Sequence, residues 1–181
     1  ESQPEPLLTL ARILRAQGKA LEAERVLRRT LEAGTNRDRR LWEAWLEVEF
    51  DENHLSPAQI LDLFPVVQHE ATNEERPTSA AGDFSDDVRW LLERLRSREG
   101  LRIDCGGADS VAPDGQAWGG DRFFLGGLPG RLEGPGIRET EADYLYWTTR
   151  EFIPMAEWPV QGYRIPLPPG PYRVKLHFAW N

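Results

Sequence analysis

At 181 residues, the chain has room for one medium-sized domain or two small ones. Hydrophobic residues make up 40% of it and include seven Trp and seven Phe, which predicts a folded protein with a buried core. Its net charge of −8 argues against nucleic acid as a partner, because binding to phosphates needs a basic face. The chain has one cysteine, which excludes an internal disulfide bond and a cysteine-rich zinc site.

The sequence predicts no membrane insertion. No run approaches the roughly 18 apolar residues that a membrane-spanning helix needs. No signal-peptide pattern is present either. Because the chain begins at Glu1 without Met, we expect a leader or a neighbouring domain to have preceded it.

Residues 1–70 predict a helical region. Two short amphipathic helices flank the turn at Gln17-Gly18-Lys19. Their apolar faces are formed by Leu7, Leu10, Ala11 and Leu14 in the first helix and by Ala23, Val26, Leu27 and Leu31 in the second. This pair of helices resembles a tetratricopeptide repeat, with Gly18 in the turn and Ala23 at the small-residue position of the second helix. A single hairpin of this kind cannot bury its own apolar face, so it must stack on another element.

Two further helices are predicted within residues 41–68, a spacing compatible with a degenerate second repeat. The first of them carries Leu41, Trp42, Trp45, Leu46 and Val48. The second begins with Ser56 as N-cap and Pro57 in the first position, and Gln59 closes a capping box. Pro65 lacks the N–H that a helix needs, so we expect a kink or an early end there.

A linker and a connecting helix are predicted to follow. Residues 71–83 are polar and rich in Thr, Glu, Ser, Ala, Pro and Gly, which is typical of a linker. Residues 84–99 predict one helix with Ser85 as N-cap and with Asp86 and Asp87 favourably placed at its N-terminal dipole.

Residues 100–181 predict antiparallel β-structure, most clearly as a hairpin of 162–167 and 171–180. Apolar side chains alternate with polar ones in both runs. The alternating apolar residues are Tyr163, Ile165 and Leu167 in the first run and Tyr172, Val174, Leu176, Phe178 and Trp180 in the second. Pro168-Pro169-Gly170 predicts a type II turn between them, with Gly170 at the position that needs a positive φ. The apolar face of this hairpin is expected to be buried.

Further short strands are predicted at 101–105 and 143–150, separated by loops rich in Gly and Pro. Because no helix lies between these strands, the pattern favours a sandwich or jelly roll over an α/β sheet. The fold class that we expect is α+β and multidomain, with helical hairpins at 1–70 followed by an antiparallel β-sandwich at 100–181.

A series of short motifs in the β region resembles the malectin domain, a carbohydrate-binding β-sandwich. In chain order they are Arg102-Ile103-Asp104-Cys105-Gly106-Gly107, Trp118 with Asp121, Gly126-Gly127, Leu145-Tyr146-Trp147-Thr148-Thr149-Arg150, Tyr163-Arg164-Ile165-Pro166-Leu167 and Gly170-Pro171-Tyr172 with Leu176-His177-Phe178-Ala179. The resemblance covers about residues 101–180 and implies a truncated domain, because the family sandwich continues where this chain stops. The combination with a helical repeat region also looks like multidomain bacterial proteins that carry signalling domains elsewhere.

A truncated sandwich has an open strand edge. The alternating run 172–180 is predicted to be that edge, which leads us to expect either poor solubility or pairing with another chain.

By this resemblance, the candidate saccharide-binding residues lie on two segments. Tyr144, Tyr146 and Phe152 are candidates for stacking on sugar rings, and Arg150 and Asp121 for hydrogen bonds to sugar hydroxyls. Alternatively, Arg150 and Asp121 are surface or loop-pinning groups, and some of the aromatic side chains fill the core. Trp147 points to the opposite face of the predicted strand from Tyr144 and Tyr146, and is expected in the core.

No catalytic or metal-binding pattern is present in the sequence. His54, His69 and His177 lie far apart and in no metal-ligand spacing. The paired glycines at 106–107 and 119–120 neither open a helix nor precede Lys-Ser/Thr, so they are turn residues rather than phosphate-binding loops. We therefore expect neither an enzyme nor a bound cofactor.

Three functional hypotheses follow. The first is a carbohydrate-binding module for a glucan-type oligosaccharide, as the resemblance implies, attached to a helical region that binds protein. The second is a protein-interaction scaffold without sugar binding. The third is an accessory part of an enzyme or signalling kinase whose catalytic domain lies outside this sequence.

Overall fold

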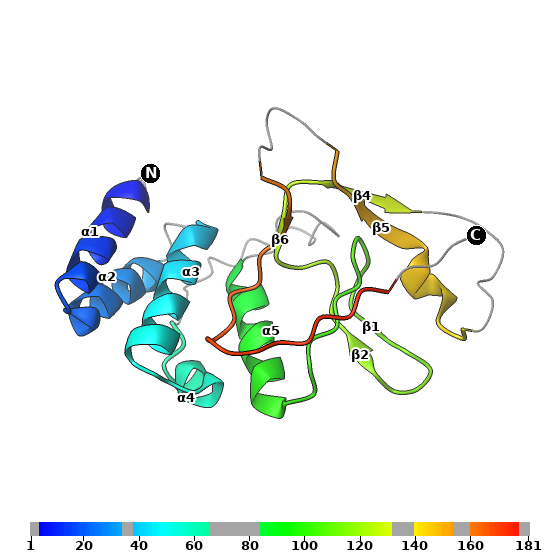
Figure 1. Ribbon diagram of the computed structural model, residues 1–181, viewed down its shortest axis with the longest axis horizontal. Coiled ribbons are helices and arrows are strands. Elements are labelled where there is room, and N and C mark those ends of the chain that lie inside the picture. Colours follow the sequence, from blue (N-terminus) through cyan, green and yellow to red (C-terminus); the bar gives the residue numbers. More distant parts are fainter. Residues whose placement is uncertain (1–3, 34–37, 66–83, 132–139, 154–159, 178–181) are drawn as a thin grey trace. The chain divides into compact units, whose positions relative to one another are not determined.

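The computed structural model describes residues 4–33, 38–65, 84–131, 140–153 and 160–177 (Figure 1). Within these residues there are five α-helices followed by three small antiparallel sheets, so the α+β class is confirmed. The chain divides into two compact units, which are described separately below. One is Glu1–Glu99 with Pro166–Gly170, and the other is Gly100–Ile165 with Pro171–Asn181. The predicted linker at 71–83 lies outside the described residues.

The first two helices are present where the sequence predicts them. They are α1 (Pro4–Ala16) and α2 (Ala20–Glu32), and Gly18 in the turn between them has a φ of +72°. The buried residues are Leu8 and Ala11 on α1 and Ala23, Leu27 and Leu31 on α2. Leu10, which was predicted on the buried face of α1, is 42% exposed, and the neighbouring Leu8 is buried in its place.

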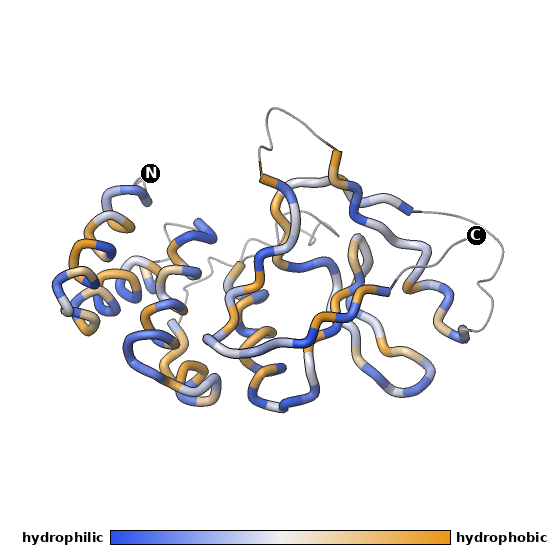
Figure 2. The backbone as a smooth tube through the Cα atoms, viewed as in Figure 1, coloured by the Kyte–Doolittle hydropathy of each residue, from blue (hydrophilic) through white to orange (hydrophobic). Residues whose placement is uncertain are grey.

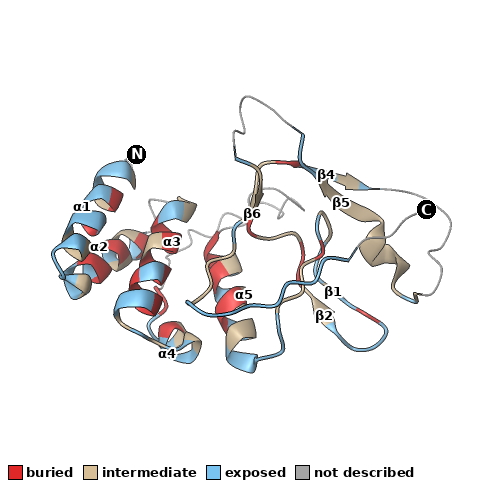
Figure 3. Ribbon diagram, in the orientation of Figure 1, coloured by how far each residue is buried: buried red, intermediate tan, exposed pale blue. Residues whose placement is uncertain are grey.

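The next helix forms the centre of the helical core. α3 (Arg39–Glu47) begins at the N-cap Asp38, whose carboxylate accepts a hydrogen bond from the Arg40 backbone N–H at 2.8 Å, and it continues directly into the π-helical turn η1 (Val48–Glu52). Residues that are less than 3% exposed recur along it (Figure 3): Leu41, Trp42, Trp45, Leu46 and Val48. This burial pattern places the large aromatic side chains of α3 inside the unit, where they contribute most to its stability.

α4 (Pro57–Asp62) confirms the predicted capping box. The Ser56 hydroxyl accepts from the Gln59 backbone N–H, and the Gln59 side chain accepts from the Ser56 backbone N–H at 2.9 Å. The helix ends before Pro65, in agreement with the early end that this proline predicts. Phe64, which follows α4, stacks on Trp42 with a ring-centroid distance of 5.2 Å and joins α4 to the core.

α5 (Phe84–Ser97) completes the helical unit and lies within the predicted range 84–99. Ser85 is inside the helix and buried, so its assignment as N-cap is wrong. The physical reason is the packing of Phe84, which is 9% exposed and lies under the Arg39 guanidinium at 4.8 Å. Asp86 and Asp87 occupy the first turn, as predicted.

The second unit contains three two-stranded antiparallel sheets. They pair β1 (Ser110–Val111) with β2 (Ala117–Trp118), β3 (Phe124–Leu125) with β6 (Gly162–Tyr163), and β4 (Leu128–Arg131) with β5 (Thr148–Glu151). Most of the described residues are in loops between these strands, and a two-layer sandwich remains a prediction.

The predicted hairpin of 162–167 and 171–180 is wrong for the residues that the structure describes. Only Gly162 and Tyr163 are in a strand, and they pair with β3, while residues 164–177 form no β-ladder. The predicted buried face is exposed, to 77% at Val174 and 75% at Leu176. Gly170 has a φ of +158° rather than the roughly +80° of a type II turn. The prolines at 166, 168, 169 and 171 explain the difference, because each removes a backbone N–H from the ladder.

Two other predicted strands are also corrected. In 101–105 the ladder is reduced to one parallel bridge between Ile103 and Gly119. In 143–150 the first half is the 3₁₀-helix η2 (Asp143–Tyr146), and only the second half belongs to β5. Tyr144 and Tyr146 therefore do not share one face of a strand.

Candidate functional site

The five predicted site residues all belong to the second unit and lie on β5 or on segments beside it. Asp121 is in the loop between β2 and β3, and Tyr144 and Tyr146 are on η2. Arg150 is on β5 and Phe152 follows it. The structure brings Asp121 and Arg150 into direct contact, whereas the aromatic residues fall at the two ends of β5.

Arg150 and Asp121 form a buried ion pair. Their side chains are 3% and 8% exposed, and Arg150 Nε donates to Asp121 Oδ2 at 2.5 Å while Nη2 contacts the same oxygen. Arg150 Nη1 donates to the backbone carbonyls of Gly126 and Gly127 at 3.3 and 3.0 Å. The guanidinium also lies 3.5 Å from the centroid of the Phe124 ring. Arg150 thus ties the loop before β4 and the loop before β3 to β5.

The second carboxylate oxygen of Asp121 is bound as well. The Tyr163 hydroxyl on β6 donates to Asp121 Oδ1 at 2.7 Å. Burial raises the pKa of Tyr163 far above its ordinary value, and the neighbouring Cys105 thiol and Asp121 carboxylate raise it further. The Tyr163 hydroxyl therefore remains a protonated donor at all physiological pH values. Asp121, Arg150 and Tyr163 direct their polar groups at one another, in agreement with a loop-pinning role for the predicted pair.

Asp104 and Thr148 form a second buried contact beside β5. The Thr148 hydroxyl donates to Asp104 Oδ1 at 2.6 Å, and Asp104 is 5% exposed. Burial raises the pKa of Asp104 to about 6, the Asp121 charge adds to this rise, and the Thr148 hydrogen bond opposes it. This carboxylate lies against Gly107, where an added Cβ would be 2.0 Å from Asp104 Oδ2, so a side chain at position 107 would displace it.

The single cysteine, Cys105, directly follows Asp104 in the sequence. Cys105 is exposed by surface area, yet desolvation by surrounding protein atoms raises the pKa of its thiol. The thiol is therefore protonated at neutral pH and is not an activated nucleophile.

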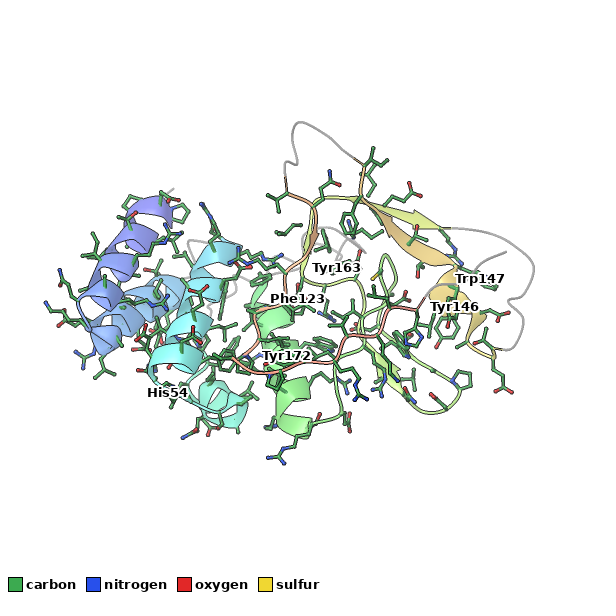
Figure 4. All side chains as sticks on the ribbon, viewed as in Figure 1. His54, Phe123, Tyr146, Trp147, Tyr163 and Tyr172 are labelled. Carbon is green, nitrogen blue, oxygen red and sulfur yellow. The ribbon has the colours of Figure 1, made fainter. Side chains whose placement is uncertain are left out.

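The segment 143–147, which we call the aromatic turn, places several aromatic residues directly before β5. It comprises η2 and Trp147, and its three aromatic residues, Tyr144, Tyr146 and Trp147, are all partly exposed. Figure 4 labels Tyr146 and Trp147 on this segment. Within the part of the chain that the structure describes, the Tyr144 hydroxyl oxygen and the Trp147 Nε1 atom are buried and have no hydrogen-bond partner. Trp147 as a whole is partly exposed, so it is not the fully buried core residue that the strand pattern predicts.

Phe152 lies at the other end of β5. Its ring meets the Tyr163 ring edge-on, with centroids 5.9 Å apart, and it is 41% exposed. From Trp147 to Phe152 the chain advances by about 16 Å at the rise of an extended strand. Phe152 and the aromatic turn therefore do not form one stacking platform.

Sequence reasoning missed Asp104, Thr148 and Tyr163 as parts of this arrangement. The signal for Asp104 was present, because a lone acid between Ile103 and Cys105 precedes Gly106-Gly107, where the backbone can approach closely. Tyr163 and Asp121 are 42 residues apart, and no local pattern predicts their contact.

The described ranges contain no group of three or more His, Cys, Asp or Glu side chains that could hold a metal ion. Among the same residues, no helix combines the length and the apolar character that crossing a membrane requires.

Comparison with protein-family models, with curated proteins and with solved structures found no significant match to this chain.

Proposed function

We propose that residues 100–181 act as a non-enzymatic carbohydrate-binding module and that the aromatic turn contacts the saccharide. The observation that carries this proposal is the aromatic turn itself, which presents Tyr144, Tyr146 and Trp147 within four consecutive positions, all partly exposed. The resemblance of the sequence motifs to the malectin domain supports a glucan-type oligosaccharide as the ligand.

The chemistry of the aromatic turn suits a sugar. Aromatic faces attract the polarised C–H groups of sugar rings, and rigid rings lose little entropy on binding. The Tyr144 hydroxyl oxygen and the Trp147 Nε1 atom are buried without a partner among the described residues, so a rearrangement that exposes them on binding would offer them to ligand hydroxyls. Stacking and hydrogen bonding are thereby available on one short segment.

The buried contacts next to the aromatic turn support it as a positioned platform. Thr148, which follows Trp147 directly, is held by Asp104, and Arg150 is held by Asp121. Fixing β5 in this way lowers the entropy that binding must remove from the aromatic turn. In this proposal Arg150 and Asp121 position the site, and Tyr144 and Tyr146 contact the ligand.

The experiment is a calorimetric titration of the whole chain with a glucan disaccharide. The change in tryptophan fluorescence on addition of the same disaccharide is a second measurement of binding. Saturable heat that is lost in Tyr146→Ala and retained in Tyr172→Ala is the expected result. Tyr172 is a matched control because it is an exposed tyrosine outside the aromatic turn. Circular dichroism of both variants verifies the fold. A folded protein that gives no heat with the disaccharide contradicts the proposal.

A second candidate function is a protein-interaction scaffold, which the helical unit favours. Leu10 and Ile13 on α1 and Leu21 on α2 are 42%, 49% and 66% exposed, although they are large and apolar. In that case the β unit is structural or accessory to an enzyme elsewhere. Ile13→Asp and Leu21→Asp should then abolish binding of the partner protein, because they remove apolar contacts that α1 and α2 offer it. Tyr146→Ala should leave that binding unchanged.

A further inference from the structure

Residues 172–177 are a continuous exposed segment with the alternating pattern of a strand, and they belong to no β-ladder in the described structure. Each of them is exposed, and the segment contains no turn or bend. Val174 and Leu176 are 77% and 75% exposed. These six residues contain no proline, so every one carries a backbone N–H and C=O that can join a ladder.

The segment is held at its C-terminal end. The His177 imidazole meets the Trp118 ring of β2 edge-on, with centroids 5.8 Å apart. An anchored segment has already lost part of the conformational freedom that pairing with another strand would remove.

The side chains of the segment alternate between apolar and cationic. Val174 and Leu176 alternate with Arg173 and Lys175, a change of colour that can be followed along the tube in Figure 2. In an extended conformation this places the two cations on one face and the apolar side chains on the other. Neither Arg173 nor Lys175 forms an ion pair with the described residues.

This charge pattern disfavours pairing of the segment with a second copy of itself. An antiparallel pair of two copies centred on Val174 would place Arg173 of each copy opposite Lys175 of the other. Like charges directly opposite each other destabilise a strand pair, and basic residues on an edge are a common means of preventing self-association. A strand with Asp or Glu at the corresponding positions would instead gain from both cations.

We propose that residues 172–177 are a docking edge for an extended segment of a partner protein in which Asp or Glu alternates with apolar residues. The partner segment adds a strand through the backbone N–H and C=O groups. Its apolar residues cover Val174 and Leu176, and its carboxylates pair with Arg173 and Lys175. This proposal is independent of saccharide binding, since none of these residues belongs to the aromatic turn.

The test uses the whole chain and three labelled synthetic peptides, with binding followed by fluorescence anisotropy. One peptide alternates Glu with Val, the second has Lys in place of each Glu, and the third has Pro in place of the central Val residues. We expect saturable binding of the Glu peptide alone. With the double variant Arg173→Glu, Lys175→Glu, binding of the Glu peptide is expected to weaken about tenfold and the Lys peptide to bind instead. Both positions are exposed, so the variant keeps the fold, which circular dichroism verifies.

Hydrogen exchange supplies the second measurement. The amides of 172–177 should exchange rapidly in the free protein and slowly when the Glu peptide is bound. The proposal is overturned by equal binding of the Glu and Lys peptides, by no binding of any peptide, or by slow exchange in the free monomer. Concentration-dependent dimerisation that protects the same amides would overturn it in favour of a second copy.

Discussion

Arg150 on β5 and Asp121 in the loop between β2 and β3 form an ion pair whose members are 29 residues apart and nearly inaccessible to solvent. Desolvation of two charges is costly, so a buried pair is stable only where further hydrogen bonds complete it. Here Asp121 accepts a further hydrogen bond from the Tyr163 hydroxyl, and Arg150 donates further hydrogen bonds to the carbonyls of Gly126 and Gly127. The pair therefore connects β3, β4, β5 and β6 through one set of contacts.

Removal of one partner of this pair should be strongly destabilising. Arg150→Ala leaves the Asp121 carboxylate buried without its cation, which is expected to lower the free energy of unfolding by about 3–5 kcal/mol. Arg131→Ala on β4 is the matched control, because Arg131 is exposed and should change stability by less than about 0.5 kcal/mol. Denaturant unfolding followed by tryptophan fluorescence measures both. Equal stability of the two variants would show that the pair does not hold the unit together.

Asp104 should make stability depend on pH between about 4 and 6. Its pKa is about 6 in the folded protein against an ordinary value of 3.8, so within this range the folded state binds the proton more tightly. Stability therefore increases as pH falls from about 6 toward 3.8, and the ionised carboxylate is a cost at pH 7. Asp104→Asn should be more stable than the wild type at pH 7 and should lose this pH dependence.

The control for Asp104→Asn is Asp114→Asn, which changes an exposed carboxylate in the loop between β1 and β2. Denaturation curves at several pH values compare the three proteins. An Asp104→Asn curve that remains parallel to that of the wild type from pH 4 to 7 would contradict the assignment.

Two neighbouring threonines on β5 should differ in how much stability is lost with the hydroxyl. Thr148→Val deprives buried Asp104 of its donor and is expected to cost about 1–3 kcal/mol. The Thr149 hydroxyl is buried without a partner in the described structure, so Thr149→Val should leave stability unchanged within about 0.5 kcal/mol. Thermal unfolding of the two variants gives the comparison. The interpretation fails if the two substitutions cost the same.

Local sequence chemistry was sufficient to predict most of the helical unit. The Ser56–Gln59 capping box and the turn at Gly18 both depend on residues within four positions of one another, and both are present. The apolar periodicity located α3 and α5, although Ser85 lies inside α5 and not at the N-cap position that the sequence predicts. Periodicity alone did not distinguish Leu8 from Leu10 as the buried residue of α1.

The β unit was harder to predict because its contacts join distant residues. The alternation at 172–177 predicts a strand, but these residues form no β-ladder, because the prolines around Gly170 prevent the ladder that the hairpin needs. Arg150 and Asp121 were both selected as polar candidates for a site, yet only the fold shows that they bind each other. Position along the chain could not reveal whether their hydrogen-bonding groups face a ligand or the protein.

Two glycines with the same backbone conformation provide a final test of how closely the segment before β1 packs against β5. Gly106 and Gly115 have φ values of +83° and +81°, so alanine at either position incurs a backbone strain of about 1–2 kcal/mol. At Gly115 an added Cβ meets nothing within 4 Å, whereas at Gly106 it would lie 2.0 Å from the Thr149 carbonyl oxygen. Gly106→Ala should therefore cost a further 1–3 kcal/mol or so, because the chain must move away from β5. Denaturant unfolding of both variants measures the difference, and equal costs would mean that the Gly106 backbone does not contact β5 in solution.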